Sequence, residues 1–122
     1  MPIERRHVGK RLSDAVVFTP GGERIVYLAG QVADDAKADM KTQTRQVLAS
    51  IDKLLTEVGS DKTRLLSATI YLPDMADFPT LNSVWEEWVV AGHTPARATV
   101  EAALAHSDYK VEIQVVATAP AA

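Results

Sequence analysis

The sequence predicts a two-layer α+β protein in which two helices cover one face of a sheet of about six strands. Two segments, residues 39–58 and 77–90, repeat apolar residues with the spacing of an amphipathic helix. Shorter segments rich in β-branched residues, or alternating between apolar and polar side chains, precede, separate and follow them, as strands do. Two such helices can cover only one face of the sheet, so the other face must meet solvent or another molecule.

Three short strands are expected near the N-terminus, at residues 3–8, 14–18 and 24–29. Pro20, Gly21 and Gly22 are typical of a turn, so the second and third strands are predicted to form a hairpin. Gly30 then interrupts the third strand. Because it has no side chain, it either lets a ligand or another backbone approach closely or simply ends the strand in a turn.

The clearest local prediction is a helix over residues 39–58, with Asp39 at its N-terminal end and Gly59 just beyond its C-terminal end. Its apolar positions are Val47, Leu48, Ile51, Leu54, Leu55 and Val58. Its opposite face is predicted to be solvated and carries Gln43, Arg45, Gln46, Lys53 and Glu57. This helix is expected to bury one face against the sheet.

The second half of the chain continues the alternation of strand and helix. Residues 65–72 alternate apolar and polar side chains as a strand does, and Pro73 ends the segment. A second helix is predicted to begin near Asp77, with Pro79 in its first turn. Trp85 and Trp88 belong to the apolar stripe of this helix, where they indicate core packing more than a ligand site.

The two final strands, at residues 96–101 and 109–116, each carry a charged residue that fits a binding or catalytic role. Alternation places Arg97 on one side of its strand together with Thr99, and a guanidinium fixed on a strand matches a carboxylate through two parallel hydrogen bonds. Glu112 on the last strand can position a water molecule or move a proton. The alternative is an ordinary ion pair between Arg97 and Glu112 on a solvated sheet face.

The face of the sheet away from the helices is predicted to mix Thr, Ser, Tyr, Arg and Glu with apolar residues. This mixture is too polar for a core and too apolar to be wholly hydrated. We therefore expect the face to pack against other copies of the same chain, with any site formed where the copies meet.

Composition excludes several kinds of site. The chain of 122 residues, expected to be a single domain over residues 1–122, has a net charge of -3, which argues against a nucleic-acid or membrane partner. It has no cysteine, so thiolate nucleophiles and thiolate metal sites are excluded. His7, His93 and His106 lack metal-ligand spacing and are expected to be structural or solvated. No leader or membrane span is evident, so a cytoplasmic location is expected.

Several motifs in order resemble the Rid family (YjgF, the reactive-intermediate deaminases). These are Tyr27–Gln31 after a hairpin, a long helix, Ala76–Asn82, Pro95–Arg97 and Lys110–Ile113. The match extends over nearly the whole chain, and the combination is more specific than any single motif.

The resemblance implies a chorismate-mutase-like α+β subunit assembled as a homotrimer, with clefts between neighbouring subunits. It also implies hydrolysis of 2-imino acids and their enamine tautomers to 2-oxo acids and ammonia, with neither a cofactor nor a metal. In this chain Arg97 matches the arginine that binds the substrate carboxylate, and Glu112 matches the acidic residue that holds the attacking water. Gly30 matches the glycine beside the ligand, and Ala29 and Thr99 occupy adjoining substrate-binding positions.

The chain departs from the family pattern at three places. Ala29 stands where many deaminating members have serine, Thr99 stands where cysteine is frequent, and the segment Gly9–Ala15 lacks the N-terminal tyrosine that often closes the cleft. These departures leave open a non-catalytic protein that binds small carboxylates. RNA cleavage, also attached to members of the family, is the least favoured function because the chain is acidic and has no paired histidines.

Overall fold

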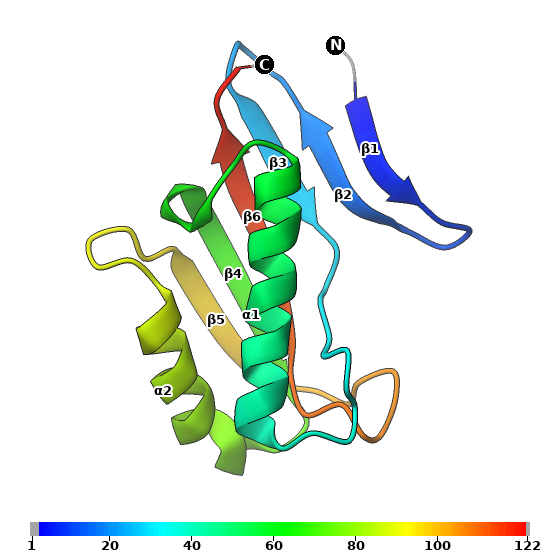
Figure 1. Ribbon diagram of the computed structural model, residues 1–122, viewed down its shortest axis with the longest axis vertical. Coiled ribbons are helices and arrows are strands. Elements are labelled where there is room, and N and C mark those ends of the chain that lie inside the picture. The colour runs from blue at the N-terminus through cyan, green and yellow to red at the C-terminus, as the bar shows by residue number, and fades with distance from the viewer. Residues whose placement is uncertain (1–2, 122) are drawn as a thin grey trace.

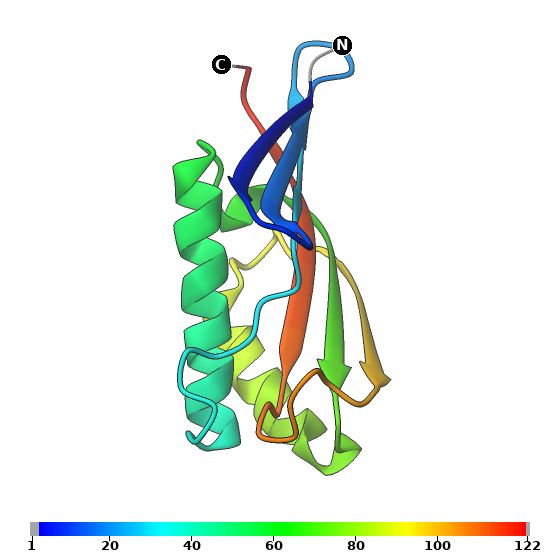
Figure 2. The same ribbon diagram turned by 90° about the vertical axis from the view of Figure 1, so that its right-hand side faces the viewer.

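The computed structural model describes residues 3–121, in which six strands form one sheet and both α-helices lie on the same face of it (Figures 1 and 2). The strands are β1 (Ile3–Val8), β2 (Ser13–Phe18), β3 (Arg24–Leu28), β4 (Leu65–Leu72), β5 (Ala96–Glu101) and β6 (Glu112–Ala119). The helices are α1 (Met40–Glu57) and α2 (Phe78–Trp88). The predicted two-layer α+β fold and its order of elements are confirmed.

The sheet order is β1-β2-β3-β6-β4-β5, and all neighbours are antiparallel except β4 and β5. The last strand, β6, is inserted between β3 and β4, which therefore run in the same direction. Each helix thus connects two parallel strands, α1 from β3 to β4 and α2 from β4 to β5. Such crossovers have one hand, so both helices lie on the same face and leave the other face open.

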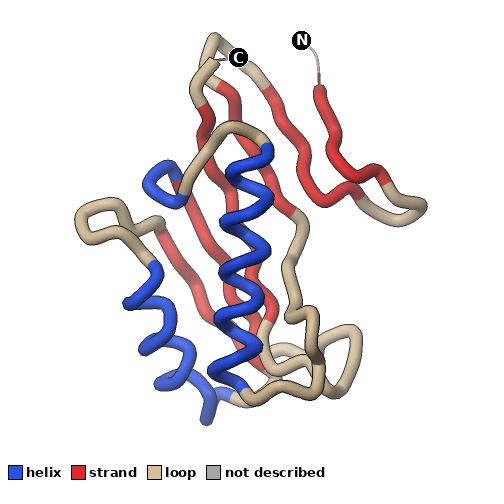
Figure 3. The backbone as a smooth tube through the Cα atoms, in the orientation of Figure 1, coloured by secondary structure: helices blue, strands red, loops and turns tan. Residues whose placement is uncertain are grey.

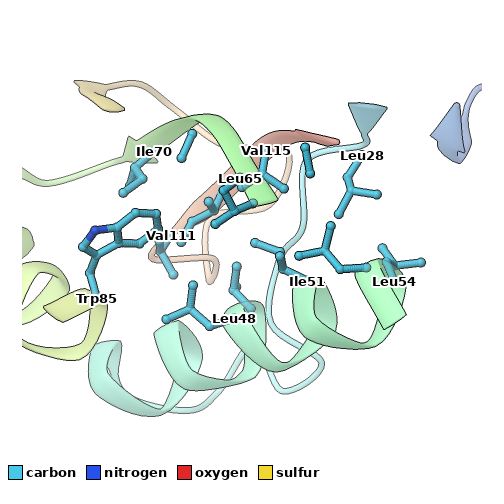
Figure 4. Close-up of a cluster of buried hydrophobic side chains, with 14 of the residues drawn as sticks. Leu28, Leu48, Ile51, Leu54, Leu65, Ile70, Trp85, Val111 and Val115 are labelled. Atoms are coloured by element: carbon cyan, nitrogen blue, oxygen red, sulfur yellow. The ribbon is translucent and has the colours of Figure 1, made fainter. Parts of the chain in front are cut away.

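The core lies between the two helices and the sheet (Figure 4). Leu48, Ile51 and Leu55 of α1 are buried, and so are Ile70 of β4 and Ile113 of β6, which pair with each other in the sheet. From α2 the core receives Leu81, Val84 and Trp85. The apolar stripes predicted for both helices are therefore the surfaces that they bury.

The ends of α1 follow from two local interactions. The carboxylate of Asp39 accepts a hydrogen bond of 2.8 Å from the Thr42 backbone N–H, and this bond lowers the pKa of Asp39. Gly59 has a φ of 80°, a conformation that glycine adopts without strain, and it turns the chain away after the last helical residue. Both predicted terminal residues are confirmed.

Gln43 is fully buried, so the prediction that it lies on a solvated face of the helix is wrong. Its Nε2 lies 3.0–3.2 Å from the carbonyl oxygens of Ala36, Ala38 and Asp108, and its Oε1 accepts a bond of 2.9 Å from the Lys110 N–H. The side chain therefore joins the β3–α1 connection to the β5–β6 connection by hydrogen bonds. Figure 3 shows these two connections meeting near the start of α1.

The last strand begins later than its sequence pattern predicts. Tyr109 and Lys110 belong to the connection, because the Lys110 N–H bonds to Gln43 in place of a neighbouring strand. The strand β6 starts at Glu112 and continues to Ala119. Glu112 is consequently the first residue of the strand, directly after the segment that Gln43 holds.

We predict that Gln43→Leu lowers the free energy of unfolding by about 2–4 kcal/mol, because it leaves several buried backbone groups without a partner. The matched control is Gln46→Leu in the same helix. The Gln46 side chain accepts one exposed hydrogen bond, from the Asp35 N–H, so this change should cost less than about 1 kcal/mol. Urea unfolding of both variants measures the difference, and equal losses would contradict the role given to Gln43.

Candidate functional site

Arg97 lies on the helix-covered face of the sheet, at the β5 edge. It is in register with Ala68 of β4, which is buried beneath the helices, and its Nη2 donates a hydrogen bond of 2.9 Å to Asn82 Oδ1 of α2. The expectation that this arginine occupies the open face is therefore wrong. The alternation along the strand is as predicted, but β5 is an edge strand whose small apolar side, with Ala98, faces outward.

The guanidinium of Arg97 is held by α2. Its Cζ lies 5.8 Å from the ring centroid of Phe78 and 5.5 Å from that of Trp85, within the range of cation–π attraction. Within residues 3–121, the bond to Asn82 is its one hydrogen bond. The remaining N–H groups of the planar fork can therefore bind an anionic ligand.

Thr99 lies on the same side of β5 as Arg97, beside the buried Ile70. Its Oγ1 is buried and has no hydrogen-bond partner among the described residues. Buried hydroxyl groups usually have a partner. The structure thus joins Arg97 and Thr99 on one face, as the alternation predicts, and adds an unsatisfied hydroxyl to the neighbourhood of the arginine.

Glu112 and Gly30 meet on the open face of the sheet. Glu112 pairs with Tyr71 of β4, and the buried Ile113 that follows it points to the opposite, helix-covered face. A Cβ added to Gly30 would lie 3.0 Å from Glu112 Cδ and would overlap Glu112 Oε2. The close approach at Gly30 is made by neither a ligand nor a backbone but by a side chain: the glycine makes room for the Glu112 carboxylate.

The segment Ala29–Gln31 holds Gly30 in this position from both sides. The Ala29 N–H donates to the Asp14 carbonyl of β2 at 2.8 Å. On the other side Gln31 exchanges two backbone hydrogen bonds with Ile113, at 2.8 and 3.1 Å. The methyl side chain of Ala29 offers no hydrogen-bonding group, so the backbone of this residue makes its hydrogen bond to Asp14.

Within one chain, Arg97 and Glu112 are held apart. They project from opposite faces of the sheet, and β4 lies between their strands. Neighbouring strands are about 4.8 Å apart, so two strand spacings separate the two backbones in addition to the difference in face. No ion pair joins them among the described residues, so the alternative of a simple Arg97–Glu112 salt bridge is wrong.

Asn82 belongs to one of the motifs that resemble the Rid family, but its contact with Arg97 was not predicted. The signal was present: Asn82 is an amide directly after the buried Leu81, within the apolar stripe of α2. A polar side chain at the border of a core needs a hydrogen-bond partner. Trp85 is core, as predicted, but its ring also contacts the guanidinium.

The described part of the chain contains no cluster of metal-binding side chains. No group of three or more His, Asp or Glu side chains is placed there to hold an ion. His93 and His106 are exposed in loops, and His7 contacts two carboxylates that lie on opposite sides of its ring. Among residues 3–121 no helix is both long enough and apolar enough to span a lipid bilayer.

Comparison with known proteins extends these observations. The family model described as endoribonuclease L-PSP matches residues 8–119. A RutC family protein of Haemophilus ducreyi is 44% identical over 115 residues, which cover 94% of this chain and 95% of the relative.

Solved structures agree with the sequence match. The crystal structure of NMB1025 from Neisseria meningitidis, a member of the YjgF protein family, has a TM-score of 0.91 and 43% identity, covering 100% of this chain and 98% of the other. YyfA of Yersinia pestis, described as belonging to the conserved Rid protein family, has a TM-score of 0.80 and 30% identity, covering 90% and 89%. The chain belongs to the endoribonuclease L-PSP family, whose members also carry the names YjgF and RutC.

Proposed function

We propose that the protein hydrolyses reactive 2-imino acids, and their enamine tautomers, to 2-oxo acids and ammonia. The observation that carries the proposal is the Arg97 guanidinium, which α2 holds at a sheet edge and most of whose N–H groups have no partner among residues 3–121. A substrate carboxylate that binds this fork in two parallel hydrogen bonds is fixed in both position and orientation.

Glu112 is the proposed acid–base group. Its carboxylate can accept a proton from a water molecule as the water oxygen attacks C2 of the iminium, which is already electrophilic. The product of this step is a carbinolamine. Glu112 returns the proton to the amine nitrogen, the C–N bond breaks to release ammonia, and the Glu112 carboxylate takes the hydroxyl proton as the 2-oxo acid forms. This sequence requires no nucleophilic side chain.

The catalytic unit is proposed to be a homotrimer with its sites between neighbouring subunits. The opposite faces of Arg97 and Glu112 support this assembly, because a three- or four-carbon imino acid cannot bridge the two groups within one chain. The open face also exposes large apolar side chains, with Tyr27 48% and Val100 42% exposed. A second copy on this face would bury them, and its Glu112 would have to reach Arg97 around the β5 edge, from which the guanidinium projects.

Thr99 and Ala29 complete the proposed substrate-binding set. The buried Thr99 hydroxyl has no partner among the described residues and lies on the Arg97 side. Ala29 would line the Glu112 side through its backbone. Since Ala29 has no side-chain hydroxyl, the ligand on that side must rely on Gly30, Glu112 and backbone groups.

A second candidate is a protein that binds 2-oxo or other small carboxylates without turnover. The absence of a side-chain hydroxyl at Ala29 favours it, because Arg97 and Asn82 alone can bind a carboxylate. Calorimetry with 2-oxobutanoate would detect such binding. Binding without any acceleration of imine hydrolysis would support this candidate over the deaminase.

RNA cleavage, which the family description names, has the least support. The net charge of -3 disfavours binding to a polyanion, and in the described residues the histidines are dispersed, with the ring of His7 engaged by carboxylates. RNA that stays intact after incubation with nuclease-free protein would exclude this function.

We expect Arg97→Lys to lower kcat/KM for imine hydrolysis about 100-fold or more, because an ammonium cannot replace the planar fork. The imine is generated in situ by a serine/threonine dehydratase, and semicarbazide traps whatever remains unhydrolysed. Arg45→Ala is the matched control, since Arg45 is an exposed arginine 3.9 Å from Glu87 on the outer side of the helices. Equal activity of Arg97→Lys and wild type would contradict the assignment.

We expect Gly30→Ala to lower kcat about tenfold or more while the fold is kept, because the added methyl group displaces the Glu112 carboxylate. Gly21→Ala is the control, since nothing lies within 4 Å of the position of its added Cβ. Steady-state kinetics and thermal unfolding of both variants test the expectation. Unchanged kcat in Gly30→Ala would show that Glu112 does not need its present position.

A further inference from the structure

His7 connects three elements at the edge of the sheet that is distant from Arg97. Its Nδ1 lies 2.9 Å from Asp14 Oδ2 of β2, and its Nε2 lies 2.5 Å from Glu57 Oε1 at the end of α1. In Figure 2 the end of β1 turns towards α1. The ring thus bridges the β1–β2 pair and the C-terminal turn of the long helix.

The backbone at His7 has a left-handed conformation. Its φ is 52°, and among the described residues it is the one non-glycine residue with a positive value. Positive φ is uncommon outside glycine, although asparagine, aspartate and histidine adopt it more often than other residues. The two carboxylate contacts fix the orientation of the ring on this backbone.

The contacts require a protonated ring to be complete. A neutral imidazole has one N–H, so one of its nitrogens would direct a lone pair at a carboxylate, whereas an imidazolium donates to both. The hydrogen bonds to Glu57 and then to Asp14 raise the pKa of His7 above its ordinary value. The bridge is therefore complete at low pH and loses a hydrogen bond when His7 is deprotonated.

Other charged groups nearby do not replace the histidine. Lys53 of α1 lines the same cavity of about 160 Å³ as His7, Asp14, Gln31 and Glu57, and it is the nearby cation on the helix. On β1, Arg6 is engaged by Glu4 at 2.7 Å. The other charged residues of β1 and the following connection are Arg5, Lys10 and Arg11, all exposed.

The bridge reaches the Gly30 segment through Asp14. The Asp14 side chain binds His7, while its carbonyl accepts the Ala29 N–H at 2.8 Å. Gln31, the residue after Gly30, lines the cavity beside His7. Asp14 of β2 therefore links His7 to one of the two sides that hold the segment Ala29–Gln31.

We infer that His7 is a pH-dependent clamp that fixes β1 and β2 against α1 and thereby fixes the Ala29–Gln31 segment beneath Glu112. The clamp is closed when His7 is protonated. As the pH rises through the raised pKa of His7, one carboxylate bond is lost and the Ala29 hydrogen bond opens more often. The inference rests on the proposed function in one respect: the position of Gly30 affects catalysis only if Glu112 is the acid–base group.

The test is amide hydrogen exchange of the full chain followed by NMR between about pH 5.5 and about pH 9, with rates corrected for intrinsic exchange. The His7 ring should titrate with a pKa above that of an ordinary histidine. The protection of the Ala29 amide should fall about twofold to fivefold over the same interval, as expected for interactions between partly exposed charged groups. The amide of Val89, which bonds to the Trp85 carbonyl, is the internal reference and should not change.

Two variants keep the test decisive. His7→Gly accepts the backbone conformation without strain, so it should fold and should lose the pH-dependent step at Ala29. His106→Gln, at an exposed loop histidine, should keep the step. A step that persists in His7→Gly, or no step in the wild type, would overturn the clamp. Exchange is measured without substrate, so failure of the proposed deaminase activity leaves this result unaffected.

Discussion

The buried side chain of Gln43 is the interaction on which the position of the site depends most. It holds two long connections together at the start of α1, one entering the helix and one leading from β5 to β6. Those connections carry the chain from Gly30 to the helix and from Arg97 to Glu112. A single amide therefore determines where β6 begins, and β6 in turn lies between β3 and β4 at the centre of the sheet. The salt bridge of 2.6 Å between Lys37 and Asp108 reinforces the same junction.

Insertion of β6 gives the sheet two chemically different faces. Arg97 belongs to the helix-covered side, where Asn82 and two aromatic rings orient its guanidinium. Glu112 belongs to the open side, where Gly30 leaves room for its carboxylate. Neither group alone can both hold a carboxylate and activate a water molecule. The proposed assembly of several copies is thus a geometric requirement of the proposed chemistry.

Local patterns predicted the elements well, because apolar spacing and end residues such as Asp39 and Gly59 depend on near neighbours in the chain. They failed where a residue's partner is distant in sequence. Gln43 looks solvated in its helix, yet its partners include the carbonyl of Asp108 and the N–H of Lys110. Alternation correctly grouped Arg97 with Thr99, but it cannot tell which face of an edge strand the helices cover. The bridge made by His7 has no sequence signature, since Asp14 and Glu57 lie seven and fifty residues away in the chain.

The most direct test of the shared site mixes two inactive variants, Arg97→Ala and Glu112→Gln, by refolding them together in equal amounts. In a trimer with sites between neighbours, about one quarter of the sites receive an intact arginine from one subunit and an intact glutamate from the next. The account predicts about one quarter of wild-type imine hydrolysis in the mixture. Activity no greater than that of the separate variants would contradict it, since a site built within one chain is never restored by mixing.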